Sequence, residues 1–183
     1  MVLIIFLILA ALVLVWFLVI YNMLVTLKTR IENAWSQIDA QLKRRHDLIP
    51  NLVEVVKAYM AYEKDTLERV IKARSQAVQA TGMKDKSEAE NFLSQALHSL
   101  FAVVEKYPDL KANQDVLKLQ EELTSTENRI SFARQYYNDE AARYNTRIQI
   151  VPIVFVARMF AFTAKDFFQM GESLEKEVPK ARP

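Results

Sequence analysis

The sequence predicts an all-α protein: an N-terminal transmembrane helix that continues into the long first helix of a helical bundle. Three observations support this class. Residues 2–20 form an unbroken apolar run, and all 24 basic and 22 acidic side chains follow it. Beyond the run, apolar residues recur every three or four positions, which is the spacing of a helix seam. Only two glycines and five prolines are present, so a sheet-rich fold with many turns is disfavoured.

The apolar run is long enough to cross a membrane. A helix of this length spans roughly 28 Å, close to the thickness of the hydrocarbon core. Trp16 and Tyr21 lie toward its carboxyl end, where amphipathic rings favour the headgroup region. A cleaved signal peptide is the alternative, but no basic residue precedes the run and no small-residue cleavage site follows it. We therefore assign residues 1–21 to a transmembrane anchor.

The charges that flank the run predict its orientation. No charged side chain precedes it, whereas Lys28, Arg30 and the basic cluster at residues 43–45 follow it. Because cytoplasmic flanks carry the excess of Lys and Arg, we expect a short N-terminus outside and the helical domain in the cytoplasm. A periplasmic domain is the alternative.

A seam of apolar residues defines the first helix. It runs through Leu24, Leu27, Ile31, Trp35, Ile38, Leu42, Ile49, Leu52, Val56 and Tyr59, with Arg45 at one seam position. The pattern predicts a single helix from the membrane to Gly82. Pro50 lacks an amide donor, and its ring clashes with the carbonyl of His46. We therefore predict a kink near Pro50, with a full break as the alternative.

Capping signals and periodicity predict three more helices. Ser87 and Glu90 resemble a capping box that opens a helix over residues 88–106. Another helix covers residues 110–149, and Thr163 is a candidate N-cap for a last helix through residue 177. We assign residues 22–177 to the helical bundle and residues 178–183 to a frayed tail.

The membrane-proximal part of the seam predicts a contact with another protein chain. The helix over residues 88–106 returns only about 28 Å, so it cannot cover the much longer first helix. Six seam residues would then face water in a monomer, and an exposed apolar stripe of this size marks a partner surface. These residues are Leu24, Leu27, Ile31, Trp35, Ile38 and Leu42.

Side chains able to perform chemistry are scarce. With no cysteine and two histidines, thiol catalysis, disulfides and a histidine-rich metal centre are disfavoured. Glycines only at positions 82 and 171 exclude a glycine-rich phosphate loop. A formal net charge of +2 gives no case for a nucleic-acid partner. We expect no catalytic, cofactor-binding or metal-ligating residue, and no enzymatic activity.

Two polar features interrupt the apolar stripes. Arg45 occupies a seam position of the first helix, and a buried arginine needs a carboxylate partner. Glu127 borders the stripe of the helix over residues 110–149, and Asn128 beside it is costly to bury alone. We predict a buried polar network of Arg45, Glu127 and Asn128, with solvated helix faces as the alternative.

The segment over residues 150–162 is almost entirely apolar, with Arg158 as its one charge. It is too short to span a bilayer. We expect it to close the bundle core, with Phe155 inside. The alternative is an exposed patch that contacts a neighbouring subunit or dips into a lipid surface.

Several motifs stand out along the chain: Tyr-Asn at 21–22, KTRIENAWSQIDAQLKRRHDLIPNLV at 28–53, YPDLKAN at 107–113 and LQEELTSTENRI at 119–130. Together they resemble the LemA family of bacterial membrane proteins. The resemblance implies a single-span protein of the bacterial inner membrane with an up-and-down four-helix bundle and no established enzymatic activity. It also implies two associations, because one relative is implicated in making magnetosome membranes and others are encoded near a membrane metalloprotease.

These observations predict a non-enzymatic, membrane-anchored helical scaffold that self-associates and organises membrane or membrane partners. The expected partners are the lipid bilayer and a second copy of the chain. The alternative is an adaptor or regulatory partner of a membrane protease or signalling enzyme.

Overall fold

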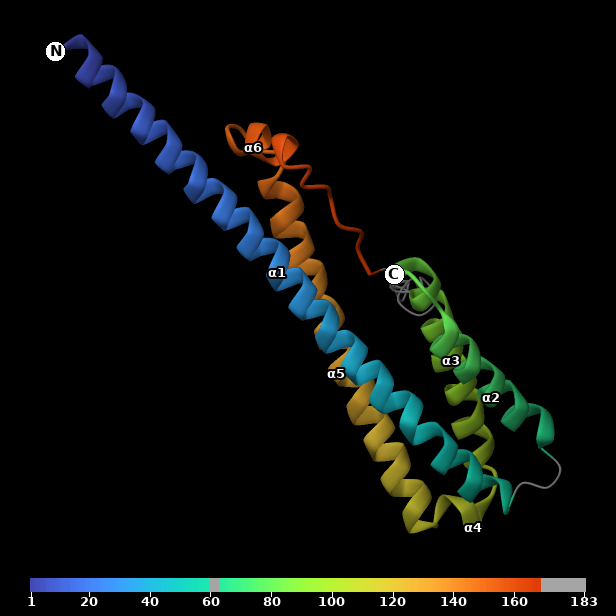
Figure 1. Cartoon of the computed structure of the whole chain (residues 1–183). Helices are drawn as coiled ribbons and strands as arrows, with labels where there is room; N and C mark the ends of the chain where they lie inside the picture. Colours follow the sequence, from blue (N-terminus) through green and yellow to red (C-terminus); the bar gives the residue numbers. More distant parts are fainter. Residues whose placement is uncertain (60–62, 169–183) are drawn as a thin grey trace, which may run out of the picture. The chain divides into compact units, whose positions relative to one another are not determined.

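The computed structural model describes residues 1–59 and 63–168, which form helices and connecting turns without a strand. In chain order the helices are α1 (Val2–Lys57), α2 (Lys64–Gln79), α3 (Met83–Val104), α4 (Pro108–Lys111), α5 (Gln114–Arg147) and α6 (Ile153–Met159) (Figure 1). The all-α class predicted from the sequence is confirmed. Residues 1–39 and 132–167 form a first compact unit, and residues 40–131 with Phe168 belong to a second. Helices α1 and α5 contribute to both units.

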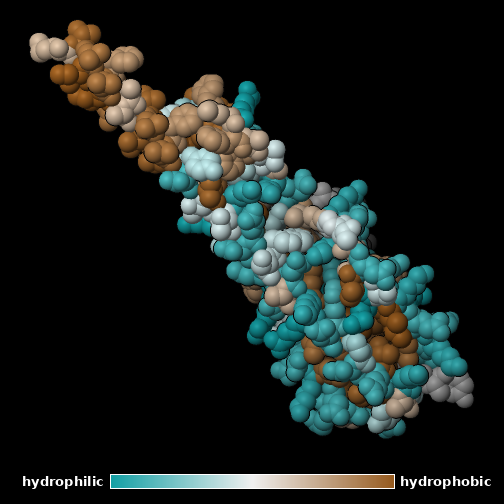
Figure 2. Space-filling view, in the orientation of Figure 1, coloured by the Kyte–Doolittle hydropathy of each residue, from teal (hydrophilic) through white to brown (hydrophobic). Residues whose placement is uncertain are grey.

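The N-terminal part of α1 is an exposed apolar helix. Residues 2–19 include no buried side chain, and only 6% of the most apolar 18-residue window is buried within the chain. Figure 2 shows this stretch as a continuous hydrophobic surface. Among the described residues, α1 is the helix that could cross a membrane by its length and composition.

Helix α1 continues through Pro50 and ends at Lys57. The alternative of a full break at this proline is therefore wrong, as is the prediction of one helix reaching Gly82. Pro50 has no N–H to donate to the carbonyl of His46. The guanidinium of Arg74 on α2 supplies a donor instead, since its Nε lies 2.7 Å from that carbonyl oxygen. A neighbouring helix thus satisfies a backbone group that the proline would leave unpaired.

In the second unit, α2 and α3 are joined through Gly82, whose φ of +83° is a conformation that favours glycine. Helix α3 begins at Met83, so Ser87 and Glu90 lie inside it and the predicted capping box is wrong. The residues of the hydrophobic core come from five helices. They are Ile49, Leu52, Val56, Leu67, Val70, Ala73, Ala77, Leu93, Ala96, Leu97, Leu100, Val104, Leu110, Val116 and Leu123.

The helix predicted over residues 110–149 is divided into the short α4 and the long α5. The side chain of Asn113 marks the boundary between them. Its Oδ1 accepts hydrogen bonds from the backbone N–H groups of Asp115 at 2.9 Å and Val116 at 3.2 Å. Such bonds satisfy donors that have no partner in the first turn of a helix, so α5 starts immediately after Asn113.

The membrane-proximal seam is covered within the single chain. Its buried members are Leu24, Ile31, Ile38 and Leu42, and its half-buried members are Leu27 and Trp35. In the first unit the ring of Trp35 packs edge-on against Tyr137 of α5, with centroids 5.8 Å apart. The expectation that this stripe faces water is wrong, because its residues are buried or half-buried and α5, which has 34 residues, packs against Trp35 through Tyr137. Four of the six residues are buried and two are half-buried, so the basis for their predicted contact role is lost.

An extended segment follows α6. Asn145 of α5 binds both backbone groups of Lys165: Nδ2 donates to the carbonyl and Oδ1 accepts from the N–H, each at 2.8 Å. Tyr137 Oη donates to the carbonyl of Asp166 at 3.0 Å. The predicted helix from Thr163 is therefore wrong over residues 163–168. Its remainder, and the predicted tail at 178–183, lie outside the described residues.

The apolar segment at residues 150–162 is divided between core and surface. Ile153, Val156 and Ala157 of α6 are buried in the first unit. Phe155 is 64% exposed, so its predicted place in the core is wrong. Successive residues of a helix turn by about 100°, and the buried positions leave Phe155 on the opposite face. Helix α6 consequently carries apolar side chains on its buried face and, beside Arg158, on its exposed face as well.

Candidate functional site

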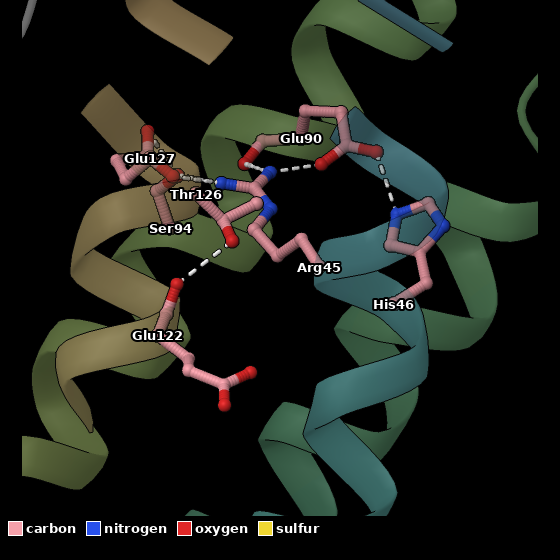
Figure 3. Close-up of polar contacts among 7 residues, drawn as sticks. All are labelled: Arg45, His46, Glu90, Ser94, Glu122, Thr126 and Glu127. Carbon is pink, nitrogen blue, oxygen red and sulfur yellow. Dashed lines mark hydrogen bonds and ion pairs between the residues drawn. The ribbon is translucent and has the colours of Figure 1, made fainter. Parts of the chain in front are cut away.

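A cluster of charged side chains lies inside the second unit, and Arg45 is at its centre. Helix α1 places Arg45 on the buried seam between Leu42 and Ile49, and its side chain is only 1% exposed. A guanidinium in this position must be paired, because removing an unpaired charge from water costs several kcal/mol. We call the interacting residues the Arg45 cluster: Arg45, His46, Glu90, Ser94 and Glu127 (Figure 3).

The two ends of the Arg45 guanidinium contact different helices. Nη2 pairs with the carboxylate of Glu90 on α3 and also donates to the Glu90 backbone carbonyl at 3.3 Å. Nη1 pairs with the carboxylate of Glu127 on α5 and donates to Ser94 Oγ at 3.0 Å. The planar, multi-donor shape of the guanidinium suits this role, since it directs donors to two partners at once. Arg45 thereby joins α1, α3 and α5.

Glu90 is buried as deeply as Arg45, with 1% of its side chain exposed. One carboxylate oxygen pairs with Arg45, and the other lies 2.7 Å from Nε2 of His46. Burial alone would raise the pKa of Glu90, but the hydrogen bond with His46 and the positive charge of Arg45 outweigh it and lower this pKa below its ordinary value. The Glu90 carboxylate is therefore held ionised inside the protein.

Glu127 is the more solvated partner, because 45% of its side chain is exposed. Ser94 Oγ donates to its second carboxylate oxygen at 3.5 Å. Thr126, although buried, donates its hydroxyl to the carbonyl of Glu122 at 2.7 Å within α5 (Figure 3). The Thr126 hydroxyl is thus satisfied by its own helix, and Glu127 is the carboxylate with which α5 reaches Arg45.

The geometry of the cluster favours helix cross-linking over reaction chemistry. A nucleophile needs a base within hydrogen-bond reach, and the base near Ser94 Oγ is the Glu127 carboxylate, which lies 3.5 Å away and is already paired with Arg45, while His46 contacts Glu90. Across residues 1–59 and 63–168, no group of three or more His, Cys, Asp or Glu side chains is placed to hold a metal ion. Both carboxylates are instead committed to the same guanidinium.

The structure brings Arg45 and Glu127 into the pair that the sequence predicts. Asn128 is exposed, so its predicted place in the buried network is wrong: residue 128 lies on the outer face of α5. Sequence reasoning missed Glu90, which it took for a capping residue. A signal for it was present, because the buried seam of α3 passes through Ser87, Glu90, Leu93, Leu97, Leu100 and Val104. Glu90 interrupts that seam in the way that Arg45 interrupts the seam of α1.

Comparison with known proteins identifies relatives over most of the chain. The LemA family model matches residues 34–182. Magnetosome protein MamQ 2 of Paramagnetospirillum magneticum is 25% identical over 175 residues, which cover 81% of this chain and 64% of that protein. Protein LemA of Metamycoplasma hominis is 29% identical over 131 residues, covering 69% of this chain and 58% of that protein. The chain therefore spans less than two thirds of the length of each of these relatives.

Proposed function

Because this chain belongs to the LemA family and one of its helices is apolar enough to cross a membrane, we propose that it is a non-enzymatic membrane-anchored scaffold. In this proposal it self-associates and organises membrane or membrane partners. The observation that carries the proposal is the continuity of α1, which holds both the exposed apolar run and the buried Arg45. One helix thus links an anchor to the polar centre of a packed helical unit.

The Arg45 cluster supports a scaffold because its charges face one another within the chain. Buried polar pairing of this kind specifies the register of the helices that it joins. A rigid arrangement of α1, α3 and α5 would present a defined surface to partners. Following the charge asymmetry of the sequence, we place this domain in the cytoplasm, on the side of Lys28 and Arg30.

The surface that we propose for self-association lies on α5. With the membrane-proximal seam covered, the exposed aromatic residues of this helix are the stronger candidates for a contact. Phe132 is 72% exposed and Tyr136 is 45% exposed, and residues four apart lie on the same side of a helix. Aromatic side chains supply large contact area, and they are enriched among the residues that dominate binding.

The test uses the full chain in particles cut directly from its native membrane. Mass measurement on these particles is expected to find more than one copy of the chain. Replacing both aromatics, Phe132→Ser with Tyr136→Ser, should shift the mass toward one copy. Ser, Phe and Tyr have similar helix propensities, so α5 itself should persist. The control is Gln135→Ser on the same exposed side of α5, which should leave the mass unchanged.

The outcomes separate the proposal from its competitor. A single copy in every wild-type particle would contradict self-association. One foreign protein bound to a single copy, and lost on removing the two aromatics, would instead support an adaptor for a membrane protease or signalling enzyme.

A further inference from the structure

Besides the apolar run of α1, the first unit has an exposed apolar surface around α6. Its residues share high exposure: Val151 is 74% exposed, Phe155 64%, Met159 69% and Phe160 46%. We call these four residues the α6 patch. Phe155 and Met159 are four positions apart in α6 and so lie on one side of the helix, and both side chains are exposed. Four large apolar side chains are therefore presented outward by a segment that is already apolar on its inner face.

The position of the patch relative to α1 is fixed by aromatic contacts within the first unit. The ring of Phe160 lies 6.2 Å from that of Phe17 and 4.7 Å from that of Tyr21, measured between centroids. Phe162 approaches Tyr21 as well, at 6.0 Å. Phe17 belongs to the exposed apolar run, and Tyr21 follows its last residue. The α6 patch is consequently continuous with the carboxyl end of that run, as the hydrophobic surface around α6 in Figure 2 shows.

This continuity identifies what covers the patch. If the apolar run lies in hydrocarbon, Tyr21 lies at the headgroup level, where aromatic rings are favoured. Helix α6 is then held at the same level, beside the span. We propose that the α6 patch is a lipid-binding surface that inserts into the leaflet at the carboxyl end of the α1 span. This proposal rests on the membrane anchoring included in the proposed function.

The chemistry of the segment fits an interfacial site. Helices in this location bury apolar side chains about 5–10 Å into the boundary between headgroups and acyl chains. Arg158 is exposed beside Met159, and Arg147 is exposed in the last turn of α5. Guanidinium groups pair well with lipid phosphates, so the two arginines would hold the headgroups while the patch enters the acyl region.

The natural absence of cysteine allows a direct test with single-cysteine variants of the full chain. Phe155→Cys carries a fluorescent probe in the α6 patch. Asp139→Cys places the same probe on an exposed polar position of α5, and Leu9→Cys places it inside the span. Each variant is reconstituted in nanodiscs of phosphatidylethanolamine and phosphatidylglycerol. Quenching is measured with aqueous iodide and with two spin-labelled lipids, one labelled near the glycerol end of the acyl chain for position 155 and one labelled near its methyl end for position 9.

At position 155 we expect strong quenching by the labelled lipid and iodide quenching several-fold weaker than at position 139. Equal iodide quenching at 155 and 139, with no lipid quenching at 155, would overturn the proposal. Protection of position 155 from both quenchers would also overturn it, because a protein chain would then cover the patch. Position 9 separates the failure of the α6 proposal from the failure of membrane anchoring. Lipid quenching at position 9 without lipid quenching at 155 would retain the α1 anchor and reject the lipid-binding patch. The absence of lipid quenching at position 9 would reject the anchor itself.

Discussion

The Arg45 cluster of the second unit and the α6 patch of the first reverse the usual distribution of residue types. One places charged groups in the interior, and the other places large apolar groups on the surface. The two regions differ in the groups with which their side chains interact. The guanidinium of Arg45 meets two carboxylates of the same chain. The side chains of the α6 patch remain exposed, and the nearby apolar run points to lipid as their complement.

The largest expected effect comes from breaking the internal complement of the Arg45 cluster. Arg45→Met leaves the Glu90 carboxylate buried without its cation, so the free energy of unfolding should fall by about 3–5 kcal/mol. The matched control is Arg44→Met, because Arg44 lies 3.9 Å from Glu122 with both side chains about half exposed, 51% and 52%. That exposed pair should contribute about 0–1 kcal/mol. Denaturant unfolding of the full chain in micelles measures both, and equal losses would contradict the account.

Two adjacent residues of α6 allow a direct comparison of a buried position with an exposed one. Val156 is fully buried and Phe155 is 64% exposed. Val156→Asp should lower the free energy of unfolding by at least about 2 kcal/mol, because it forces a polar group into the core. Phe155→Asp should lower it clearly less in micelles, because position 155 lies outside the packed protein core. Equal losses from the two substitutions would place Phe155 in the core.

Pro50 provides a third test, because Arg74 donates to the carbonyl that the proline leaves without a backbone partner. Arg74→Met should cost about 1.5–3 kcal/mol, the range for a hydrogen bond from a charged donor. In a Pro50→Ala background the restored amide can donate to His46 instead, so the same substitution should cost less. The double-mutant comparison measures this directly. Identical costs in the two backgrounds would show that Arg74 does not compensate for the proline.

A smaller effect is expected from pH. Because the pKa of Glu90 is lowered in the folded protein, its contribution to stability is fully present above the ordinary value of 4.5. This contribution is lost as the pH falls through the lowered folded-state pKa. We therefore expect the free energy of unfolding to decrease as the pH falls below 4.5 and through the lowered pKa of Glu90. The decrease should be weaker in Glu90→Gln. Burial opposes the two attractive interactions, which limits the size of the effect. Superimposable pH profiles would contradict the assignment.

The apolar rhythm and the breaking residues are enough to predict an all-helical chain, a long apolar N-terminal helix and helix termini near Gly82 and Pro108. Which helix covers which seam could not be predicted, because helix periodicity gives the direction of a face but not the partner. The periodicity of the stripe from Leu24 to Leu42 is therefore equally consistent with an external contact and with the internal one that the structure shows. Similarly, Pro50 alone indicates a kink or a break in α1. The donor that satisfies the His46 carbonyl belongs to Arg74, which is distant in sequence, so its contribution cannot be predicted from the local pattern.

For the site, one charged residue on an apolar seam was a sufficient signal for Arg45. The same test applied to α3 would have found Glu90, but Ser87 and Glu90 also match a capping box. Local capping chemistry and seam position gave different interpretations of the same residue. The prediction for Asn128 was wrong in the opposite direction, because an exposed residue was assigned to the buried network. Asn128 is close to the buried stripe in sequence, but the rotation of about 100° per residue places it on the surface.

The most direct test of the account is the coupling energy between Arg45 and Glu90. In a double-mutant cycle of Arg45→Met and Glu90→Gln, each single change removes one charge of the buried pair and leaves Arg45 with Glu127 or Glu90 with His46, whereas the double change removes both charges of the pair. We predict a coupling of about 1–3 kcal/mol, together with an additive result for the exposed Arg44 and Glu122 pair used as the control. Additivity within about 0.5 kcal/mol at Arg45 and Glu90 would contradict the claim that this charge is compensated inside the chain.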